Sequence, residues 1–206
     1  MNRLVEQLLR VARLDAISLD VSGRVNLESL ASDVVATMAP WAVAQGRAVA
    51  LAGAVNPVWV RGNAPAISDA LRNLVENAVL YSDSGDEVEI GVAAEGTISV
   101  ADRGPGIPVA EREHAFDRFW RGKRSGVEGA GLGLSIAREI MMMHGGSVRI
   151  TDNPGGGTIV VLSFPRVAAE DDAVGFPSSS DLSVATASRP EAQKSDQPSA
   201  MPADHV

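Results

Sequence analysis

Hydrophobic residues recur every three or four positions in three segments of the chain, a spacing that places them on one face of an α-helix. The longest segment runs from about residue 64 to residue 81, and another begins after Asn26, a residue that suits a helix N-cap. We expect Pro40 to end or kink that helix. A third helix is predicted from about residue 134 to residue 144. The apolar faces of the first two helices are formed by Ile67, Leu71, Leu74, Val75 and Ala78 and by Leu27, Leu30, Val34 and Met38.

Apolar and polar residues alternate in several shorter segments, with the period of a half-buried β-strand. Two of these segments are joined by a turn at Glu95-Gly96, and the last two flank Asn153-Pro154-Gly155-Gly156-Gly157, a strong turn signal. Helices combined with a sheet that contains at least one antiparallel hairpin predict an α/β (α+β) fold. The predicted strands cover residues 49–51, 58–60, 88–92, 97–101, 147–151 and 158–164.

The two ends of the chain differ from the central part. Residues 1–16 read as a helix whose apolar residues have the alternating spacing of a two-helix seam, although an ordinary surface helix would show the same periodicity. From residue 167 onward, Ala, Ser, Pro and Asp dominate and no apolar stripe can be drawn, which predicts a disordered tail. We therefore divide the chain into residues 1–16, 17–166 and 167–206.

Composition and charge exclude several classes of function. The chain has no cysteine, so neither a disulfide framework nor a thiolate metal site can support the fold. Of the formal net charge of −8, the segment 167–206 carries seven acidic and two basic residues, and the remainder contains no basic stripe that would favour nucleic acid. No apolar run could cross a bilayer. We expect a soluble, cytoplasmic chain without nucleic-acid partners or direct membrane contact.

Two asparagines stand four residues apart in the predicted helix 64–81. Asn73 and Asn77 project from the same face, opposite the apolar stripe. Asparagine is a mediocre helix former, so a pair on one face calls for solvent or a ligand. Amide oxygens suit magnesium, which takes its remaining ligands from phosphates and water.

Asp102 follows a predicted strand directly and is followed by Gly104 and Gly106. Glycines let a flat ligand approach the backbone, and a buried carboxylate accepts a hydrogen bond from the exocyclic amine of adenine. Guanine would present a carbonyl oxygen at that point. The motif fits an adenine selector, and it fits equally a tight turn with no ligand.

Gly129, Gly131 and Gly133 lead into the predicted helix 134–144. Free backbone amides and the positive end of the helix dipole favour phosphate oxygens there. The charged segment 121–128 before them reads as a mobile lid. Just before this lid, Phe116, Phe119 and Trp120 alternate with Arg118 and Arg121, and the aromatic residues serve either as anchors of the lid or as core residues.

In this order the motifs Asn73…Asn77, Asp102-x-Gly-x-Gly, Phe-x-Arg-Phe, Gly-x-Gly-Leu-Gly-Leu and Gly-Gly-Gly-Thr resemble the catalytic ATP-binding domain of sensor histidine kinases. The resemblance spans about residues 14–164. It implies a two-layer α/β sandwich of the Bergerat type, shared by gyrases, chaperones and kinases, with a mixed sheet packed on helices and ATP held under a lid.

The resemblance also implies ATP and Mg²⁺ as cofactors. Asn73 and Asn77 match the family's N box around magnesium and the phosphates, and Asp102 matches its adenine-binding aspartate. Glu76 is a further catalytic candidate, although helical geometry rotates it about 100° from Asn77. The implied nucleotide-binding residues are Asn73, Asn77, Tyr81, Asp102, Gly104, Gly106, Ile107, Phe119, Arg121, Gly129, Gly131, Leu132, Gly133, Leu134 and Thr158.

The partners implied by the resemblance lie outside this chain. Residues 1–16 look like the end of the family's second dimerisation helix, which implies a homodimer through this helix. The phosphoacceptor histidine of the family stands in a stretch such as Ser-His-Glu, which does not occur here, and His114, His144 and His205 have other contexts. We expect His144 to be a structural cation at a helix end before Gly145. Phosphate would go to a histidine on a separate dimerisation domain and then to a response regulator, and a sensor region elsewhere could tether the assembly to the inner membrane.

One departure from the family pattern is Leu80, where many relatives carry a lysine or arginine that reaches the phosphates. Arg72, Arg118 or Arg121 could compensate. Two alternatives to a histidine kinase stay open at this point: an ATP-binding serine kinase of the anti-sigma type, and a non-catalytic module that binds a partner in response to nucleotide.

Overall fold

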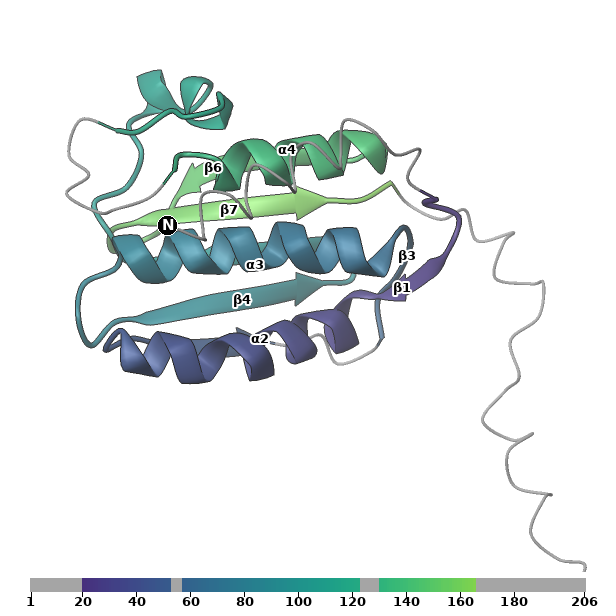
Figure 1. Cartoon of the computed structure of the whole chain (residues 1–206), viewed down its shortest axis with the longest axis horizontal. Helices are drawn as coiled ribbons and strands as arrows, with labels where there is room; N and C mark the ends of the chain where they lie inside the picture. Colours follow the sequence, from purple (N-terminus) through teal and green to yellow (C-terminus); the bar gives the residue numbers. More distant parts are fainter. Residues whose placement is uncertain (1–19, 53–56, 123–129, 166–206) are drawn as a thin grey trace, which may run out of the picture. The chain divides into compact units, whose positions relative to one another are not determined.

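The computed structural model describes residues 20–52, 57–122 and 130–165, which all belong to one compact unit (Figure 1). The predicted helix at residues 1–16, the predicted tail at residues 167–206 and Gly129 lie outside the described residues.

Five strands form one mixed sheet in the order β2-β4-β5-β7-β6. β2 runs parallel to β4, and the other neighbouring pairs are antiparallel. The predicted turn at residues 153–157 joins β6 to β7, so the final hairpin is confirmed. The strands are β2 (Ala48–Ala52), β4 (Glu87–Ala93), β5 (Thr97–Ala101), β6 (Ser147–Asp152) and β7 (Thr158–Ser163).

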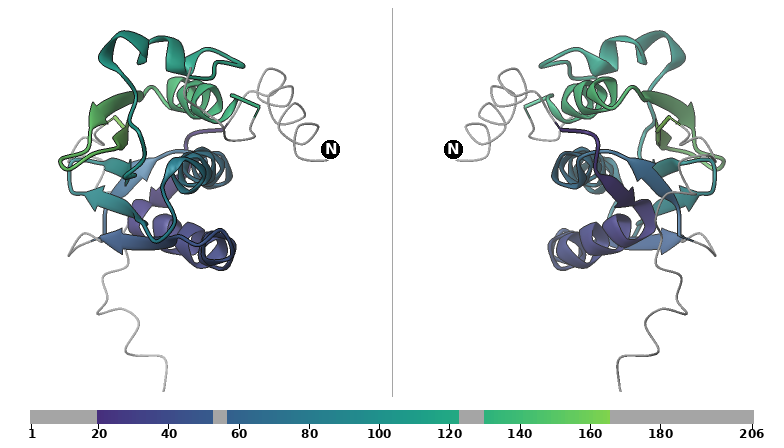
Figure 2. Two further views of the ribbon diagram at one scale, coloured as in Figure 1. Left: turned by 90° about the vertical axis from the view of Figure 1, so that its left-hand side faces the viewer. Right: turned by 90° about the vertical axis from the view of Figure 1, so that its right-hand side faces the viewer.

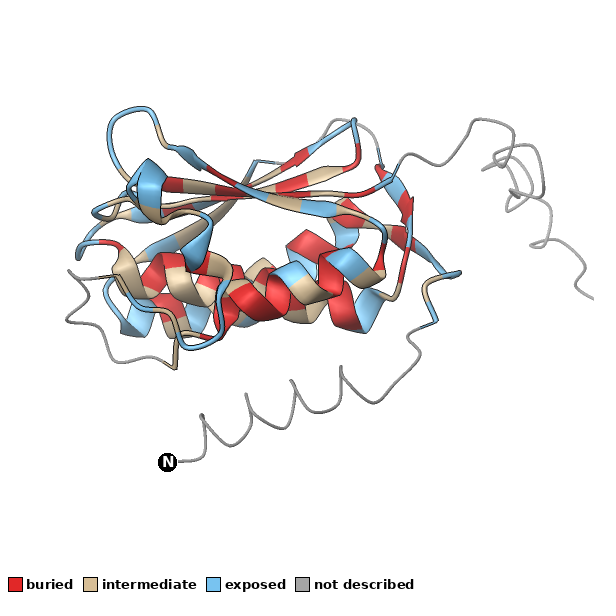
Figure 3. Ribbon diagram, turned by 90° about the horizontal axis from the view of Figure 1, so that it is seen from above, coloured by how far each residue is buried: buried red, intermediate tan, exposed pale blue. Residues whose placement is uncertain are grey.

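Three helices cover one face of this sheet, and views from the side and from above show the helices and the sheet as two layers (Figures 2 and 3). The helices are α2 (Leu27–Ala44), α3 (Ala64–Tyr81) and α4 (Gly133–Met143). This arrangement confirms the two-layer α/β sandwich. Within the described part of the chain, no helix is both long enough and apolar enough to cross a membrane.

The hydrophobic core lies between the two layers, and α3 is its central helix. The five residues of the predicted α3 stripe are all buried, and they face the alternate residues of the strands that point inward. Burying such side chains is the main favourable term in folding, about 1.5–3 kcal/mol for each large one. The fully buried side chains include Ile67, Leu71, Leu74, Ile90, Ile98 and Leu162.

Asn26 caps α2 as predicted: its Oδ1 accepts hydrogen bonds from the backbone N–H groups of Glu28 and Ser29, at 3.0 and 3.3 Å. The residues before the cap form a strand that the pattern did not predict. This strand, β1 (Arg24–Asn26), pairs antiparallel with β3 (Trp59–Arg61) as a separate two-stranded sheet. Three residues are too few for an alternation to be recognised.

The prediction that Pro40 might end α2 was wrong, because the helix continues to Ala44. A proline inside a helix removes one backbone hydrogen bond, that of residue 40 to the carbonyl of Ala36. Both residues are exposed, so water can reach that carbonyl. The next turn is held in place by the buried Ala42 and the half-buried Trp41, which pack against the core.

His144 occupies the C-cap of α4 and Gly145 follows with φ +63°, as the pattern indicated. The ring, however, is a buried neutral group and not the cation that we expected. Its Nε2 accepts the backbone N–H of Asn63 at 3.0 Å, and its Nδ1 lies 2.7 Å from the carbonyl oxygen of Ile140. An accepting Nε2 and a donating Nδ1 define the neutral imidazole. The histidine thus joins the end of α4 to the start of α3.

Replacing His144 by Phe should lower the free energy of unfolding by roughly 1–3 kcal/mol, because the ring shape is kept while the N–H of Asn63 loses its acceptor and the Ile140 carbonyl keeps only the backbone N–H of residue 144. Chemical denaturation measures the change. The control is Met142→Ala, two residues earlier on the same helix at a side chain that is 68% exposed. Equal stabilities of His144→Phe and the wild type would contradict this role.

Candidate functional site

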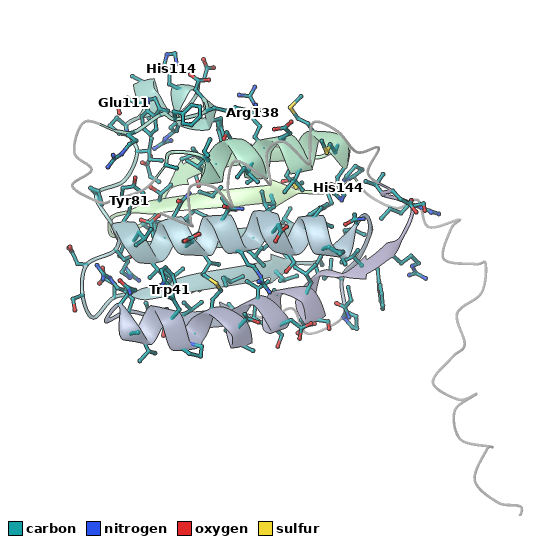
Figure 4. All side chains as sticks on the ribbon, in the orientation of Figure 1. Trp41, Tyr81, Glu111, His114, Arg138 and His144 are labelled. Atoms are coloured by element: carbon teal, nitrogen blue, oxygen red, sulfur yellow. The ribbon has the colours of Figure 1, made fainter. Side chains whose placement is uncertain are left out.

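The predicted site residues converge at one end of the sandwich, where α3 ends, α4 begins and the loop after β5 meets the β6–β7 turn. Figure 4 shows Tyr81 at this end of α3. The segment after that loop forms two short 3₁₀ helices, η1 (Val109–Glu111) and η2 (His114–Phe116), which the pattern did not predict.

The side chain of Asn77 lies against the first residue of α4. A Cβ atom added to Gly133 would stand 2.7 Å from Nδ2 of Asn77 and 3.1 Å from its Oδ1, so residue 133 must lack a side chain for the amide to lie there. Leu132 stands at the N-cap of α4, and within the described residues its side chain makes no capping hydrogen bond. The side-chain amide of Asn77, whose oxygen can bind a cation, therefore lies next to the backbone N–H groups of the first turn of α4, which can bind an anion.

Asn73 lies deeper than Asn77. It is only 2% exposed, and its Nδ2 donates to the backbone carbonyl of Asp69 at 2.7 Å. Glu76 is half-buried on a neighbouring face of the helix. Of the three N-box candidates, Asn77 has the contact with α4.

Asp102 is fixed by its backbone neighbours. Its Oδ1 accepts the N–H groups of Gly104 at 2.9 Å and Thr158 at 3.1 Å, and its own N–H donates to the carbonyl of Thr158 at 2.9 Å. Oδ2 accepts no hydrogen bond from the described residues, which leaves this oxygen available to a ligand. Burial raises the pKa of Asp102, the charge of Asp86 adds to the rise, and the two backbone hydrogen bonds oppose it.

Two glycines allow the backbone around Asp102 to pack closely. A Cβ on Gly104 would lie 2.5 Å from the carbonyl oxygen of Tyr81, which places the Asp102 loop against the end of α3. A Cβ on Gly157, where φ is +99°, would lie 2.0 Å from the carbonyl oxygen of Asp102. The last glycine motif thus supports the aspartate from behind.

The two ends of the predicted lid are joined to each other. The N–H of Phe119 donates to the carbonyl of Gly131 at 2.9 Å, and Arg118 pairs with Glu139 of α4 at 3.0 Å. Phe119 has φ +68°, a conformation that costs a non-glycine residue about 1 kcal/mol or more, and it is 60% exposed. Residues 123–129 between these ends lie outside the described residues.

The aromatic residues before the lid have different positions. Phe116 and Trp120 pack against the core as partly buried residues, whereas Phe119 does not. Arg121 is exposed at the start of the lid. The core-residue interpretation therefore holds for Phe116 and Trp120 only.

The remaining predicted binding residues differ in how far they are buried. Leu132 and Thr158 are buried residues, 1% and 4% exposed. Ile107 and Leu134 are half-buried and pack on the core with part of their surface exposed.

The pattern missed residues that hold the site from behind. Arg47 donates from Nε and a terminal nitrogen to the carbonyl of Ser82, at 3.1 and 2.6 Å, and so fixes the end of α3 next to Tyr81. Asn153, noted only as a turn residue, donates from Nδ2 to the carbonyl of Asp102 at 2.7 Å. Both bonds join side chains to distant backbone carbonyls, which leave no mark in the sequence.

The chain belongs to the family of histidine kinase-, DNA gyrase B- and HSP90-like ATPases, whose family model matches residues 62–168, about half of its length. This confirms the resemblance, and the family is one of ATPases. The described residues contain no group of three or more His, Cys, Asp or Glu side chains that could hold a metal ion.

Similar proteins are sensor kinases. The signal transduction histidine-protein kinase/phosphatase MprB of Mycolicibacterium vanbaalenii is 38% identical over 132 residues, which cover 58% of this chain and 27% of that protein. The sensor protein kinase PmrB of Pseudomonas aeruginosa is 37% identical over 169 residues, 79% of this chain and 35% of PmrB. The chain thus spans between a fifth and about a third of the length of such relatives.

Solved structures agree with this family. The full-length ShkA structure in complex with AMPPNP has a TM-score of 0.63 at 27% identity and covers 80% of this chain and 36% of that one. A structure of the mycobacterial sensor histidine kinase MprB has a TM-score of 0.59 at 26% identity and covers 70% of this chain and 97% of that one.

Gly133→Ala should weaken ATP binding roughly tenfold by pushing the Asn77 amide away from α4, which removes about one hydrogen bond or ligand contact to a charged group. The fold should tolerate the change within about 1 kcal/mol, because alanine is a better helix residue than glycine. Titration calorimetry with Mg-ATP and thermal unfolding measure the two effects.

The double variant Gly133→Ala/Asn77→Ala serves as the control. If Gly133→Ala acts through the displaced amide, it adds no further loss once Asn77 is alanine. Additive losses would contradict that explanation.

Proposed function

We propose that this chain binds Mg-ATP and donates the γ-phosphate to a histidine on a dimerisation helix outside the chain, as the catalytic domain of a histidine kinase in two-component signalling. The observation that carries the proposal is the contact of Asn77 with Gly133. It sets an amide side chain beside the first turn of α4, whose N-terminal amides would bind the phosphates of the nucleotide.

The donor set fits magnesium. Asn77, with Asn73 behind it, would supply amide oxygen, and phosphates and water would complete the octahedral shell. Bound magnesium would neutralise charge on the β- and γ-phosphates. The N-terminal amides of α4 would orient the phosphate oxygens, so that positioning and charge stabilisation do most of the catalytic work.

Asp102 would recognise adenine. The oxygen that has no partner among the described residues, Oδ2, would accept the exocyclic amine, while Oδ1 stays bound to the backbone of Gly104 and Thr158. Tyr81, the last residue of α3, and Ile107, at the end of the loop that Asp102 begins, would contact the base.

The cation that many relatives carry at position 80 would come from the lid. Leu80 is a half-buried apolar residue here, and Arg118 is paired with Glu139. Arg121, which is exposed where the predicted lid begins, would take this role, with Arg72 and Arg118 as the other candidates.

The histidines in the described part of this chain are poor acceptors. His144 is buried with both ring nitrogens engaged, and His114 lies in a three-residue 3₁₀ helix beside Asp117. Neither histidine therefore offers a free ring nitrogen from an exposed position on a long helix. These positions support an acceptor histidine on another segment, from which a response regulator would receive the phosphate.

Transfer should occur from γ-labelled Mg-ATP to the histidine of a dimerisation domain taken from a relative such as PmrB, and the label should be acid-labile. The chain alone should bind ATP, acquire no label and release little phosphate, since Asn73 stands where an ATPase would need an acid to activate water. Asn77→Ala should reduce the transfer at least tenfold.

Other outcomes would identify a different function. Fast phosphate release by the chain alone would indicate an ATPase, and acid-stable label on a partner would indicate a serine kinase. Nucleotide binding with no transfer to any dimerisation domain would indicate a binding module. The matched control for Asn77→Ala is Gln45→Ala, which removes an exposed amide side chain at the end of α2 and changes neither α3 nor α4.

The affinity for ATP should fall as the pH is lowered, because the exocyclic amine needs an ionised Asp102 carboxylate. Since the pKa of Asp102 is raised, the loss should begin above the ordinary value of 3.8. Asp102→Asn should bind ATP at least tenfold more weakly at pH 7. The ratio of the dissociation constants of Asp102→Asn and the wild type, followed from pH 7 to pH 4, cancels the titration of ATP itself.

The same pKa predicts that Asp102→Asn does not unfold the protein. A group whose pKa is raised by folding stabilises the protein at low pH, and this stabilisation is lost as the pH rises through the folded pKa. At pH 7 the ionised carboxylate therefore adds no stability, and asparagine keeps the accepting Oδ1.

A ratio of the Asp102→Asn and wild-type dissociation constants that stays constant as the pH is lowered would contradict the assignment of Asp102 to adenine.

A further inference from the structure

The loop of residues 102–107 is attached at its first residue to the turn between β6 and β7. Asn153 donates from Nδ2 to the carbonyl of Asp102, and the backbone N–H of Thr158 donates to the carboxylate of the same residue. Gly106 extends the attachment, since a Cβ there would lie 3.3 Å from the carbonyl oxygen of Gly157. One hairpin therefore supports the start and the middle of the loop.

The far end of the loop is attached to the same hairpin through Arg112. Its Nε donates to the carbonyl of Ile107 at 3.0 Å, and its terminal NH2 group forms an ion pair with Asp152, the last residue of β6. The Arg112 side chain is only 18% exposed, although that of Asp152 is 77% exposed. A guanidinium in this position bridges two elements that the backbone does not join directly.

We propose that Arg112 is a positioning residue for adenine recognition, a role that rests on the proposed function of this site. It fixes the position of Ile107 relative to Asp102, because both residues are then bonded to the β6–β7 hairpin, Ile107 through Arg112 and Asp102 directly. Arg112 itself does not touch the nucleotide. It sets the distance between the residue that would accept the exocyclic amine and the residue that would contact the face of the base.

Only arginine can make both contacts. The planar guanidinium donates from Nε toward Ile107 and from a terminal nitrogen toward Asp152, in directions fixed by its geometry. A lysine ammonium is a single point at the end of a flexible chain and could serve one partner only. Arg112→Lys should therefore behave like Arg112→Gln despite keeping the charge.

The effect should be confined to the base. The phosphates would be held by Asn77 and by α4, which have no bond to Arg112. Because GTP carries a carbonyl oxygen where ATP has the 6-amino group that Asp102 would recognise, its weak binding should depend on the phosphates and be insensitive to Arg112. Loss of Arg112 should therefore reduce the preference for ATP over GTP.

The test measures dissociation constants of Mg-ATP and Mg-GTP, with thermal unfolding, for the wild type, Arg112→Gln, Arg112→Lys and Asp152→Ala. We expect both Arg112 variants to bind ATP roughly tenfold more weakly with GTP binding unchanged, and Asp152→Ala to lose about threefold. The control is Arg138→Gln, an exposed arginine whose guanidinium lies over the Phe116 ring at 5.8 Å. It should leave both constants unchanged.

A charge reversal separates positioning from simple stabilisation. In Arg112→Asp/Asp152→Arg the ion pair can form again, but no donor reaches the Ile107 carbonyl. Positioning predicts that the melting temperature recovers while ATP affinity does not. Recovery of both, or parallel losses of ATP and GTP binding in the Arg112 variants, would overturn the proposal.

Failure of this inference is distinct from failure of the proposed function. If the wild type binds neither ATP nor GTP, the nucleotide-binding function itself is wrong. If the wild type binds ATP selectively and the Arg112 variants do so equally well, only the role of Arg112 is wrong.

Discussion

The site depends on one close approach, that of the Asn77 amide to the first turn of α4. It is possible only because residue 133 has no side chain, and any larger residue would separate the two helices or turn the amide away. The two helices also form the centre of the core, so their spacing is set by buried residues such as Leu74 and Ile136. The chemistry of the site is thus determined by the packing of the fold.

The sequence predicted the elements whose signals are local. The apolar stripe of α3, the cap at Asn26 and the turn at residues 153–157 each depend on a few neighbouring residues, and each was found. Pro40 was misread because its cost depends on whether Ala36 is exposed, which a pattern cannot show. β1 was missed because its partner, β3, lies more than thirty residues away.

In the site, motif residues could be predicted and their supports could not. Asp102 and Gly133 belong to short motifs, whereas Arg47, Arg112 and Asn153 act through side-chain hydrogen bonds to backbone carbonyls of other segments. Such bonds depend on where the fold brings two segments together. His144 shows the same limit, since a helix-end histidine looks like a cation until the N–H of Asn63 is found to point at its ring.

The bond between His144 and Asn63 has a mechanical consequence. It ties α4 to α3 at the end of the pair that lies away from Asn77, over the length of a helix of 11 residues, or about 16 Å at 1.5 Å per residue. When two helices are joined at one end, a rotation of one relative to the other moves their opposite ends furthest apart. A rotation of only a few degrees about this pivot would change the gap between Asn77 and Gly133 by about 1 Å, so the buried imidazole gives the phosphate end of the site a lever arm.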